Sequence, residues 1–163
     1  MTLDHSELLE RLDYDVSTGS LTWKAKTKSS LIGKEAGRIC KFHGYRIVKI
    51  SQVAYPAHRL IWFYMNKVWP EFEIDHIDGD KLNNRIENLR DVPHSVNCQN
   101  KRRAQSDNKL GFQGVRKREG RNFYEWSVKL NGKVVEGGWE LSAEKAHAAY
   151  VIAKRKHHIG CTI

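Results

Sequence analysis

The chain has 163 residues, a formal net charge of +9 and 40% apolar residues. That apolar content can fill a core and excludes global disorder, while the excess of Lys and Arg indicates an anionic partner or a basic, water-facing surface. No apolar run reaches 18 residues and the first 20 do not read as a signal peptide, so we expect a cytoplasmic protein without a membrane partner. Three scattered cysteines support neither a disulfide framework nor a structural zinc site.

The first part of the chain predicts a helix, two hairpins and a second helix. Asp4, with a glutamate three residues later, begins a helix-start pattern. Hairpins are expected over residues 14–23 and 38–50, where short alternating runs flank glycine turns. The apolar run at 57–65 is expected to be a buried helix, because Pro56 suits a helix start.

Residues 74–100 are rich in Asp, His and Asn and poor in core-forming residues. We expect a short strand at 74–77, a loop at 79–85, a second strand at 89–92 and a helix over 93–103. These elements would form a β-β-α unit with polar residues on its strand end, loop and helix. Burying polar groups costs free energy unless they have hydrogen-bond partners, so a polar segment that is kept in an ordered fold indicates a function.

The last third predicts a second, smaller module. Residues 104–113 are polar and aperiodic, and we interpret them as a linker. Strands are expected at 114–117, 124–130 and 133–136, with a strong Asn-Gly hairpin signal between the last two. Ser142 is expected to cap a helix that carries a stripe of alanines.

Four polar residues of the central stretch suit phosphodiester hydrolysis if the anionic partner is DNA. That reaction needs a base for water, a cation for the developing charge and a scaffold for both. Asp75 offers a hard carboxylate oxygen of the kind Mg²⁺ prefers, and His76 offers an imidazole base. Asn97 could reach back with an amide oxygen, and Asn88 is placed to hold the loop and orient His76 through a backbone contact. On its own, however, an Asp-His pair is more often a surface turn.

Other polar residues could join such a site. Arg59 and Arg85 could each clamp a phosphate, although for Arg59 an ion pair with a nearby acid is as good an explanation. Asn83 and Asn84 are more often turn formers than site residues. Three further candidates are His58, His94 and Asn100.

The central stretch contains four motifs in order: Asp75-His76-Ile77-Asp78-Gly79-Asp80, Asn83-Asn84-Arg85, Glu87-Asn88-Leu89-Arg90 and Asn97-x-x-Asn100. With an upstream half that includes Gly19-Ser20-Leu21-Thr22-Trp23 and His58-Arg59-Leu60, they resemble the HNH nucleases of phage and intron homing type. The resemblance implies that Asp75 and Asn97 hold one divalent ion, that His76 is the general base and that Asn88 fixes the loop. The family often has His where Asn97 stands, and an amide oxygen favours Mg²⁺ or Mn²⁺ over Zn²⁺.

The tail contains a second set of motifs: Gly114-Val115-Arg116, Trp126, Asn131-Gly132-Lys133, Gly138-Trp139 and Ala146-x-x-Ala149-Tyr150-x-x-Ala153. These resemble the ethylene-responsive-factor type DNA-binding domain, although Gly120 and Val135 replace that family's DNA-contacting tryptophans. The expected sheet face could lie in a DNA major groove, or it could simply be solvated. The resemblance implies DNA-contacting positions at four basic residues: Arg116, Arg118, Lys129 and Lys133.

We therefore expect an α+β protein with an HNH nuclease domain at 1–103 (metal motif 74–103), a linker at 104–113 and an ethylene-responsive-factor type domain at 114–163. Its expected activity is metal-dependent, homing-type cleavage of double-stranded DNA, either nicking or cutting both strands. A monomer without an obligate protein partner is favoured, in the host cytoplasm if the chain is encoded by a bacteriophage. The main alternative is a non-catalytic DNA-binding regulator on a degenerate HNH scaffold, and charge also permits an RNA-directed nuclease.

Overall fold

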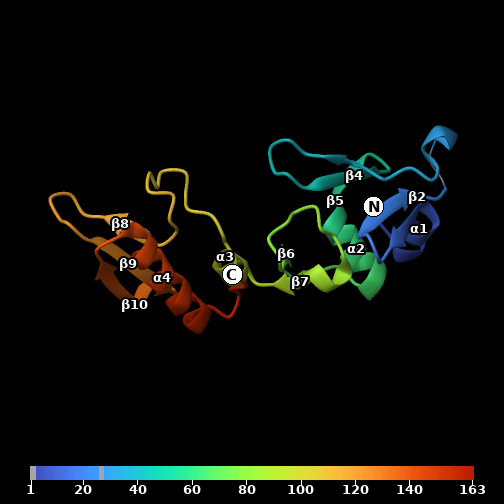
Figure 1. The fold of residues 1–163 in the computed structure, drawn as a ribbon. Helices are drawn as coiled ribbons and strands as arrows, with labels where there is room; N and C mark the ends of the chain where they lie inside the picture. The colour runs from blue at the N-terminus through green and yellow to red at the C-terminus, as the bar shows by residue number, and fades with distance from the viewer. Residues whose placement is uncertain (1–2, 26–27) are drawn as a thin grey trace. The chain divides into compact units, whose positions relative to one another are not determined.

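The computed structural model describes residues 3–25 and 28–163 (Figure 1). These residues form a mixed α and β fold of four α-helices and four small antiparallel sheets. They divide into two compact units, one ending at Pro93 and the other beginning at His94. No helix within the described residues is long and apolar enough to cross a membrane.

The N-terminal unit begins with α1 (His5–Arg11), followed by a hairpin of β1 (Leu12–Asp15) and β2 (Ser20–Trp23). The carboxylate of Asp4 accepts a hydrogen bond from the Ser6 N–H, which confirms the expected helix start. Alternate residues of β1 are buried, so the hairpin lays one face on the core. A short 3-10 helix (η1, Ser29–Leu31) follows.

A three-stranded sheet and α2 complete the core of this unit. The sheet order is β3 (Arg38–Ile39), β4 (Arg46–Ile50) and β5 (Val53–Pro56), and Pro56 leads directly into α2 (Ala57–Asn66). The apolar pattern predicted β3 and β4 but not β5, whose first two residues are exposed. The core is made of apolar residues from all these elements: Leu8, Leu12, Leu21, Val48, Ile50, Leu60 and Ile61.

The expected pair of short strands is β6 (Glu73–His76) and β7 (Leu89–Val92), with a 3-10 turn (η2, Ile86–Asn88) leading into β7. The two strands pair antiparallel, which sets Asp75 opposite Arg90. Ile74, Asp75 and His76 are all buried. Since successive side chains point to opposite faces of a strand, β6 is covered on both sides.

The C-terminal unit contains α3 (His94–Gln99), a sheet of β8 (Val115–Lys117), β9 (Tyr124–Leu130) and β10 (Lys133–Glu140), and α4 (Ala143–His157). The sheet order is β10-β9-β8. The Asn-Gly turn between β9 and β10 has positive φ at both residues, as its hairpin requires. Helix α4 starts at Ser142, whose hydroxyl caps the Lys145 N–H, and packs on Val128 through Tyr150 and Ala153.

Helix α3 and the segment expected to be a linker pack within the C-terminal unit. The Gln99 side chain accepts a hydrogen bond from the Gly160 N–H (3.0 Å). The Lys154 ammonium, almost fully buried, donates to the Lys101 carbonyl (2.6 Å) and to the Gln113 side chain (3.1 Å). These contacts join Lys101 and Gln113, on either side of most of the expected linker, to α4.

Candidate active site

Asp75 and Arg90 form an ion pair between β6 and β7. The Arg90 side chain donates two hydrogen bonds to Oδ2 of Asp75, from Nε at 2.9 Å and from Nη2 at 2.7 Å. Asp75 is 7% exposed. A carboxylate this buried needs a compensating positive charge, and Arg90 supplies one because the strand register sets the two residues opposite each other.

His76, the next residue of β6, is 4% exposed and points to the other side of the strand. Its Nε2 lies 3.0 Å from Oδ1 of Asn84, a buried residue of the loop between β6 and β7. Asp75 and His76 therefore have separate partners on the two sides of one strand.

Two further rings pack against His76. The His58 ring, at the start of α2, contacts it edge-on with centroids 5.2 Å apart, and the Tyr45 ring lies 5.9 Å away. Tyr45 also contacts His58 at 4.9 Å. Burial, with smaller contributions from His76 and Arg59, lowers the pKa of His58 to about 3. His58 is therefore a neutral ring at neutral pH, and it limits the directions in which the His76 ring can turn.

Asn88 holds the loop that joins the strands. Its side chain accepts a hydrogen bond from the Asp78 N–H (3.0 Å) and donates to the Asp78 carboxylate (2.9 Å) and to the Asn83 carbonyl (2.7 Å). Its own carbonyl accepts from the Ile77 N–H at 2.9 Å, directly after His76. Desolvation raises the pKa of Asp78, but the hydrogen bonds from Asn83, Asp80 and Asn88 outweigh it and leave the pKa below its usual value.

The two arginines expected near the phosphate bind backbone carbonyls in the structure. Arg59 donates to the carbonyls of Phe72 (3.0 Å) and Pro70 (3.5 Å), so its partner is the loop after α2 rather than an acid. Arg85 is exposed, and its Nε donates to the Ser17 carbonyl at 2.7 Å. Both guanidinium groups keep further N–H donors that could meet a phosphate.

Helix α3 carries the polar residues of the third motif. Asn97 is half-buried, and Asn100 is buried and accepts a hydrogen bond from the Thr162 hydroxyl. His94 contacts the thiol of Cys98 one turn later, with Nε2 and Sγ 3.3 Å apart. Since α3 packs with the C-terminal unit, the pairing of Asp75 with Asn97 stays a prediction.

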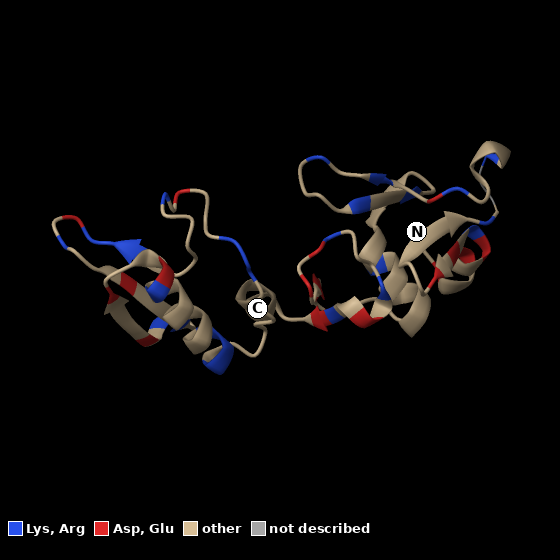
Figure 2. Ribbon diagram, viewed as in Figure 1, with Lys and Arg blue, Asp and Glu red and all other residues tan. Residues whose placement is uncertain are grey.

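The four basic residues expected to contact DNA are all exposed: Arg116, Lys129 and Lys133 on the sheet of the C-terminal unit, and Arg118 directly after β8. Figure 2 shows Lys and Arg colouring β8 and the end of α4. Arg118 pairs with Glu125 at 2.9 Å, so part of its charge is already compensated. Trp139, 64% exposed, lies opposite Glu125 in the pairing of β9 with β10.

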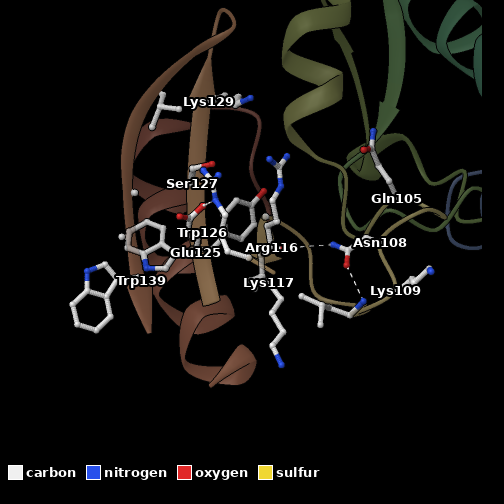
Figure 3. Close-up of a pocket in the computed structure, with 18 of the residues that line it drawn as sticks. Gln105, Asn108, Lys109, Arg116, Lys117, Glu125, Trp126, Ser127, Lys129 and Trp139 are labelled. Atoms are coloured by element: carbon white, nitrogen blue, oxygen red, sulfur yellow. Dashed lines mark hydrogen bonds and ion pairs between the residues drawn. The ribbon is translucent and has the colours of Figure 1, made fainter. Parts of the chain in front are cut away.

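A groove of about 1080 Å³ runs along this sheet (Figure 3). Arg116, Ser127 and Lys129 line it from the strands, and Asn108 and Lys109 line it from the segment before β8. Asn108 shapes that wall, because its side chain donates to the Phe112 carbonyl (2.7 Å) and accepts from the Leu110 N–H (3.0 Å).

Sequence reasoning missed three residues around the candidate base and carboxylate. The pairing of Arg90 with Asp75 could have been predicted from the sequence, because aligning the two short antiparallel strands sets these opposite charges across from each other. Asn84 was interpreted as a turn former and Tyr45 as part of a hairpin. For these two no local signal exists, because each contact joins segments far apart in the chain.

Residues 55–99 match the family model described as HNH endonuclease. The matched range begins in β5 and ends with α3, and it contains Asp75, His76, Asn88 and Asn97. Comparisons with curated proteins and with solved structures returned no match. The family match supports an HNH nuclease, an enzyme that hydrolyses phosphodiester bonds, and it implies a DNA substrate.

HNH nucleases generally use divalent metal ions. Among the described residues no group of three or more His, Cys, Asp and Glu side chains is arranged to hold a metal. The oxygen donors of the motif still fit a hard cation, since Mg²⁺ is usually held by one or two carboxylates with water and substrate phosphates completing its shell. Asp75 has a carboxylate of this kind, and in the structure its positive partner is Arg90.

Proposed function

We propose that this protein is a metal-dependent, homing-type DNA endonuclease whose nuclease site is built on Asp75 and His76. The observation that carries the proposal is the burial of both residues at the end of β6, each with its own partner, inside the range that matches the HNH family. An ordinary surface turn has no reason to bury an aspartate and a histidine side by side.

His76 is proposed as the general base. It would take a proton from a water molecule, whose oxygen then attacks the phosphorus of the scissile phosphodiester. Asn88 would keep the loop closed around this histidine through its contacts with Asp78 and Asn83. Arg59 and Arg85 would use their remaining N–H donors to hold phosphates of the bound strand.

Asp75 and Asn97 are proposed to hold the divalent ion, Mg²⁺ or Mn²⁺. When bound, such an ion supplies positive charge for the phosphate as negative charge develops on it. Arg90 already occupies one oxygen of Asp75, so this arginine would have to share the carboxylate or move when the ion binds.

The C-terminal unit is proposed to bind double-stranded DNA through its sheet, in the manner of the ethylene-responsive-factor type domain. Support comes from three exposed basic side chains along one groove: Arg116, Arg118 and Lys129. Exposed Lys133 at the start of β10 would add a phosphate contact. A second DNA-binding unit on the same chain raises the effective concentration of the nuclease unit at its target.

One observation favours the non-catalytic alternative, in which an HNH scaffold only binds DNA. The Arg90–Asp75 ion pair already neutralises the candidate metal ligand without any ion. In that case the purified protein would bind DNA but never cleave it.

The test is to incubate the purified protein with supercoiled plasmid in Mg²⁺, in Mn²⁺ and with a chelator. Open-circular and linear products distinguish nicking from double-strand cutting. We expect cleavage that depends on the metal and is lost in His76→Ala, but not in His43→Ala, which removes an exposed imidazole elsewhere. Equal behaviour of His76→Ala and the unmodified protein would contradict the assignment of the base.

A further inference from the structure

The buried amide of Asn84 faces His76. Asn84 is 3% exposed, and its Oδ1 lies 3.0 Å from Nε2 of His76. Its Nδ2 donates to the Leu82 carbonyl at 3.3 Å. An amide nitrogen can only donate, and a carbonyl can only accept, so the contact with Leu82 fixes which end of the amide faces the histidine.

This orientation determines where the proton of a neutral His76 ring lies. An amide oxygen accepts hydrogen bonds and never donates one, so Nε2 of His76 must carry the hydrogen. A neutral imidazole has one N–H, and the lone pair then belongs to Nδ1. The nitrogen with the lone pair is the one that can take a proton from water.

The N-terminal hairpin holds Asn84 in place. The Tyr14 hydroxyl donates to the Asn84 carbonyl (3.1 Å) and accepts from the Ile86 N–H (3.0 Å). Gly19, with φ of +76°, brings its turn so close that a Cβ there would lie 2.6 Å from the Asn84 carbonyl carbon. The backbone from the Asn84 carbonyl to the Ile86 N–H is therefore held by residues about 70 positions earlier in the sequence.

We propose that Asn84 is a positioning residue that fixes His76 in the Nε2–H tautomer, and that the β1–β2 hairpin acts as its support. This inference rests on the proposed function of His76 as the base. In the reaction the O–H bond of the attacking water breaks, its proton binds Nδ1 of His76, and the electron pair stays on the oxygen that attacks phosphorus. The Oδ1 of Asn84 accepts a hydrogen bond from the Nε2–H of His76 and so stabilises the imidazolium that results.

The competing explanation is that Asn84 only closes the loop. Its contacts with Leu82 and Tyr14 would then matter for folding, while the contact with His76 would be incidental. Stability alone cannot separate these explanations, because both predict a less stable Asn84→Ala variant. The tautomer of His76 separates them, since a loop-closing residue has no effect on which ring nitrogen is protonated.

The experiment uses ¹⁵N-labelled histidine in the full chain, with the His76 signals assigned from their loss in His76→Gln. We expect a protonated Nε2 whose hydrogen exchanges slowly with water, and an unprotonated Nδ1. Asn84→Asp keeps an acceptor and should keep this pattern, whereas Asn84→Ala should lose the slow exchange and populate both tautomers. Asn83→Ala, whose side chain contacts Asp78 instead, should retain the pattern of the unmodified protein.

An unprotonated Nε2 in the unmodified protein, or a pattern that survives in folded Asn84→Ala, would overturn the inference. These spectra need no DNA and no metal, so they stand apart from the nuclease proposal. If cleavage is lost in His76→Ala but the spectra show the other tautomer, the inference fails while the proposed function survives.

Kinetics add a second readout. A histidine base held in the wrong tautomer can lose up to about 10⁴-fold in kcat, as in serine proteases. We expect kcat to fall at least about tenfold in Asn84→Ala with KM little changed, and to recover in Asn84→Asp. If kcat falls in Asn84→Ala and is not restored in Asn84→Asp, the result would contradict control of the His76 tautomer and would support a role of Asn84 in folding alone.

Discussion

The carboxylate of Asp75 and the guanidinium of Arg90 lie directly opposite each other across β6 and β7, joined by hydrogen bonds of 2.9 and 2.7 Å. The residue proposed to hold a divalent ion is thus already paired with a positive side chain. The proposed ion would therefore share the Asp75 carboxylate with Arg90 or displace this arginine, and the effect of Arg90 on the response to Mg²⁺ can be measured.

Replacing Arg90 by Met should lower the free energy of unfolding and should increase the stabilisation gained when Mg²⁺ is added. Removing one partner of a buried ion pair costs about 3–5 kcal/mol, and we expect the lower end because Arg90 retains partial exposure. Addition of Mg²⁺ should recover more stability in Arg90→Met than in the unmodified protein, since the uncompensated Asp75 gains most from a cation. Urea denaturation with and without Mg²⁺ measures both effects.

Arg46→Met serves as the matched control, because Arg46 pairs with a more exposed acid, Glu35. Exposed pairs contribute up to about 1 kcal/mol, so a small loss with no metal dependence is expected. An identical Mg²⁺ response in Arg90→Met and Arg46→Met would argue against Asp75 as the ligand.

Gly19 and Gly33 offer a test of the hairpin support. Both have φ of +76°, but a Cβ at Gly19 would lie 2.5 Å from the Arg85 nitrogen, while nothing lies within 4 Å at Gly33. Alanine at either position should lower the free energy of unfolding by about 1–2 kcal/mol, because the backbone there is left-handed. In Gly19→Ala the steric clash should lower it by about 1–3 kcal/mol more.

Thermal or urea unfolding of the two variants gives the difference directly. Because the strain in φ is the same, it cancels between them, and the excess loss in Gly19→Ala reports the contact between hairpin and loop. Equal losses would mean that the loop moves aside without cost.

Stability should fall as the pH drops below about 6.5, because His58 is buried as a neutral ring. An unfolded histidine has a pKa of about 6.5, whereas burial lowers the pKa of His58 to about 3 in the folded protein. Between these values the unfolded chain binds a proton that the folded chain does not. The contribution is complete above pH 6.5 and declines by about 1.4 kcal/mol for each pH unit below it.

His58→Phe keeps a ring against Tyr45 and His76 and removes the titrating group. Unfolding measured at pH 7 and pH 5 should therefore show about 2 kcal/mol less pH dependence in His58→Phe than in the unmodified protein. The same pH dependence in both would show that His58 binds a proton equally well in the folded and unfolded states.

The sheet of the C-terminal unit should contribute salt-dependent DNA binding. Each lysine or arginine that neutralises a phosphate adds about 0.9 to the slope of log K against log salt. Arg116→Gln and Lys129→Gln should each reduce that slope by about one, measured by fluorescence anisotropy over a range of salt concentrations. Lys145→Gln changes an exposed lysine on α4 and should leave the slope unaltered; a uniform response of all three variants would mean that only net charge matters.

Local signals in the sequence were sufficient for most of the elements. Asp4 and Ser142 cap the helices expected after them, and Asn131-Gly132 forms the expected hairpin turn. These predictions succeed because caps and tight turns depend on a few neighbouring residues. Strand β5 was missed because its exposed residues lack the alternating apolar pattern of a half-buried strand.

The surroundings of the candidate site could be predicted only in part. Asp75, His76 and Asn88 were identified from their motif, and the structure supplies the contacts of each. Asn84 could not be assigned a partner, because its contact with His76 depends on the path of a loop held from a distant hairpin. The same limit applies to Asn108 in the expected linker, because the polar composition of that segment gave no sign that its side chain would contact the carbonyls of Phe112 (2.7 Å) and of Val115 in β8 (3.4 Å).

The packing of α3 with the last residues of the chain bears on how such proteins could exchange parts during evolution. Gln99 and Asn100 contact Gly160 and Thr162, so a segment transferred between related proteins would remain intact only if it began near His94. Such a segment carries Asn97 with it. A recombination event that replaced the unit proposed to bind DNA would then also replace one proposed metal ligand, so that target preference and metal preference would be inherited together.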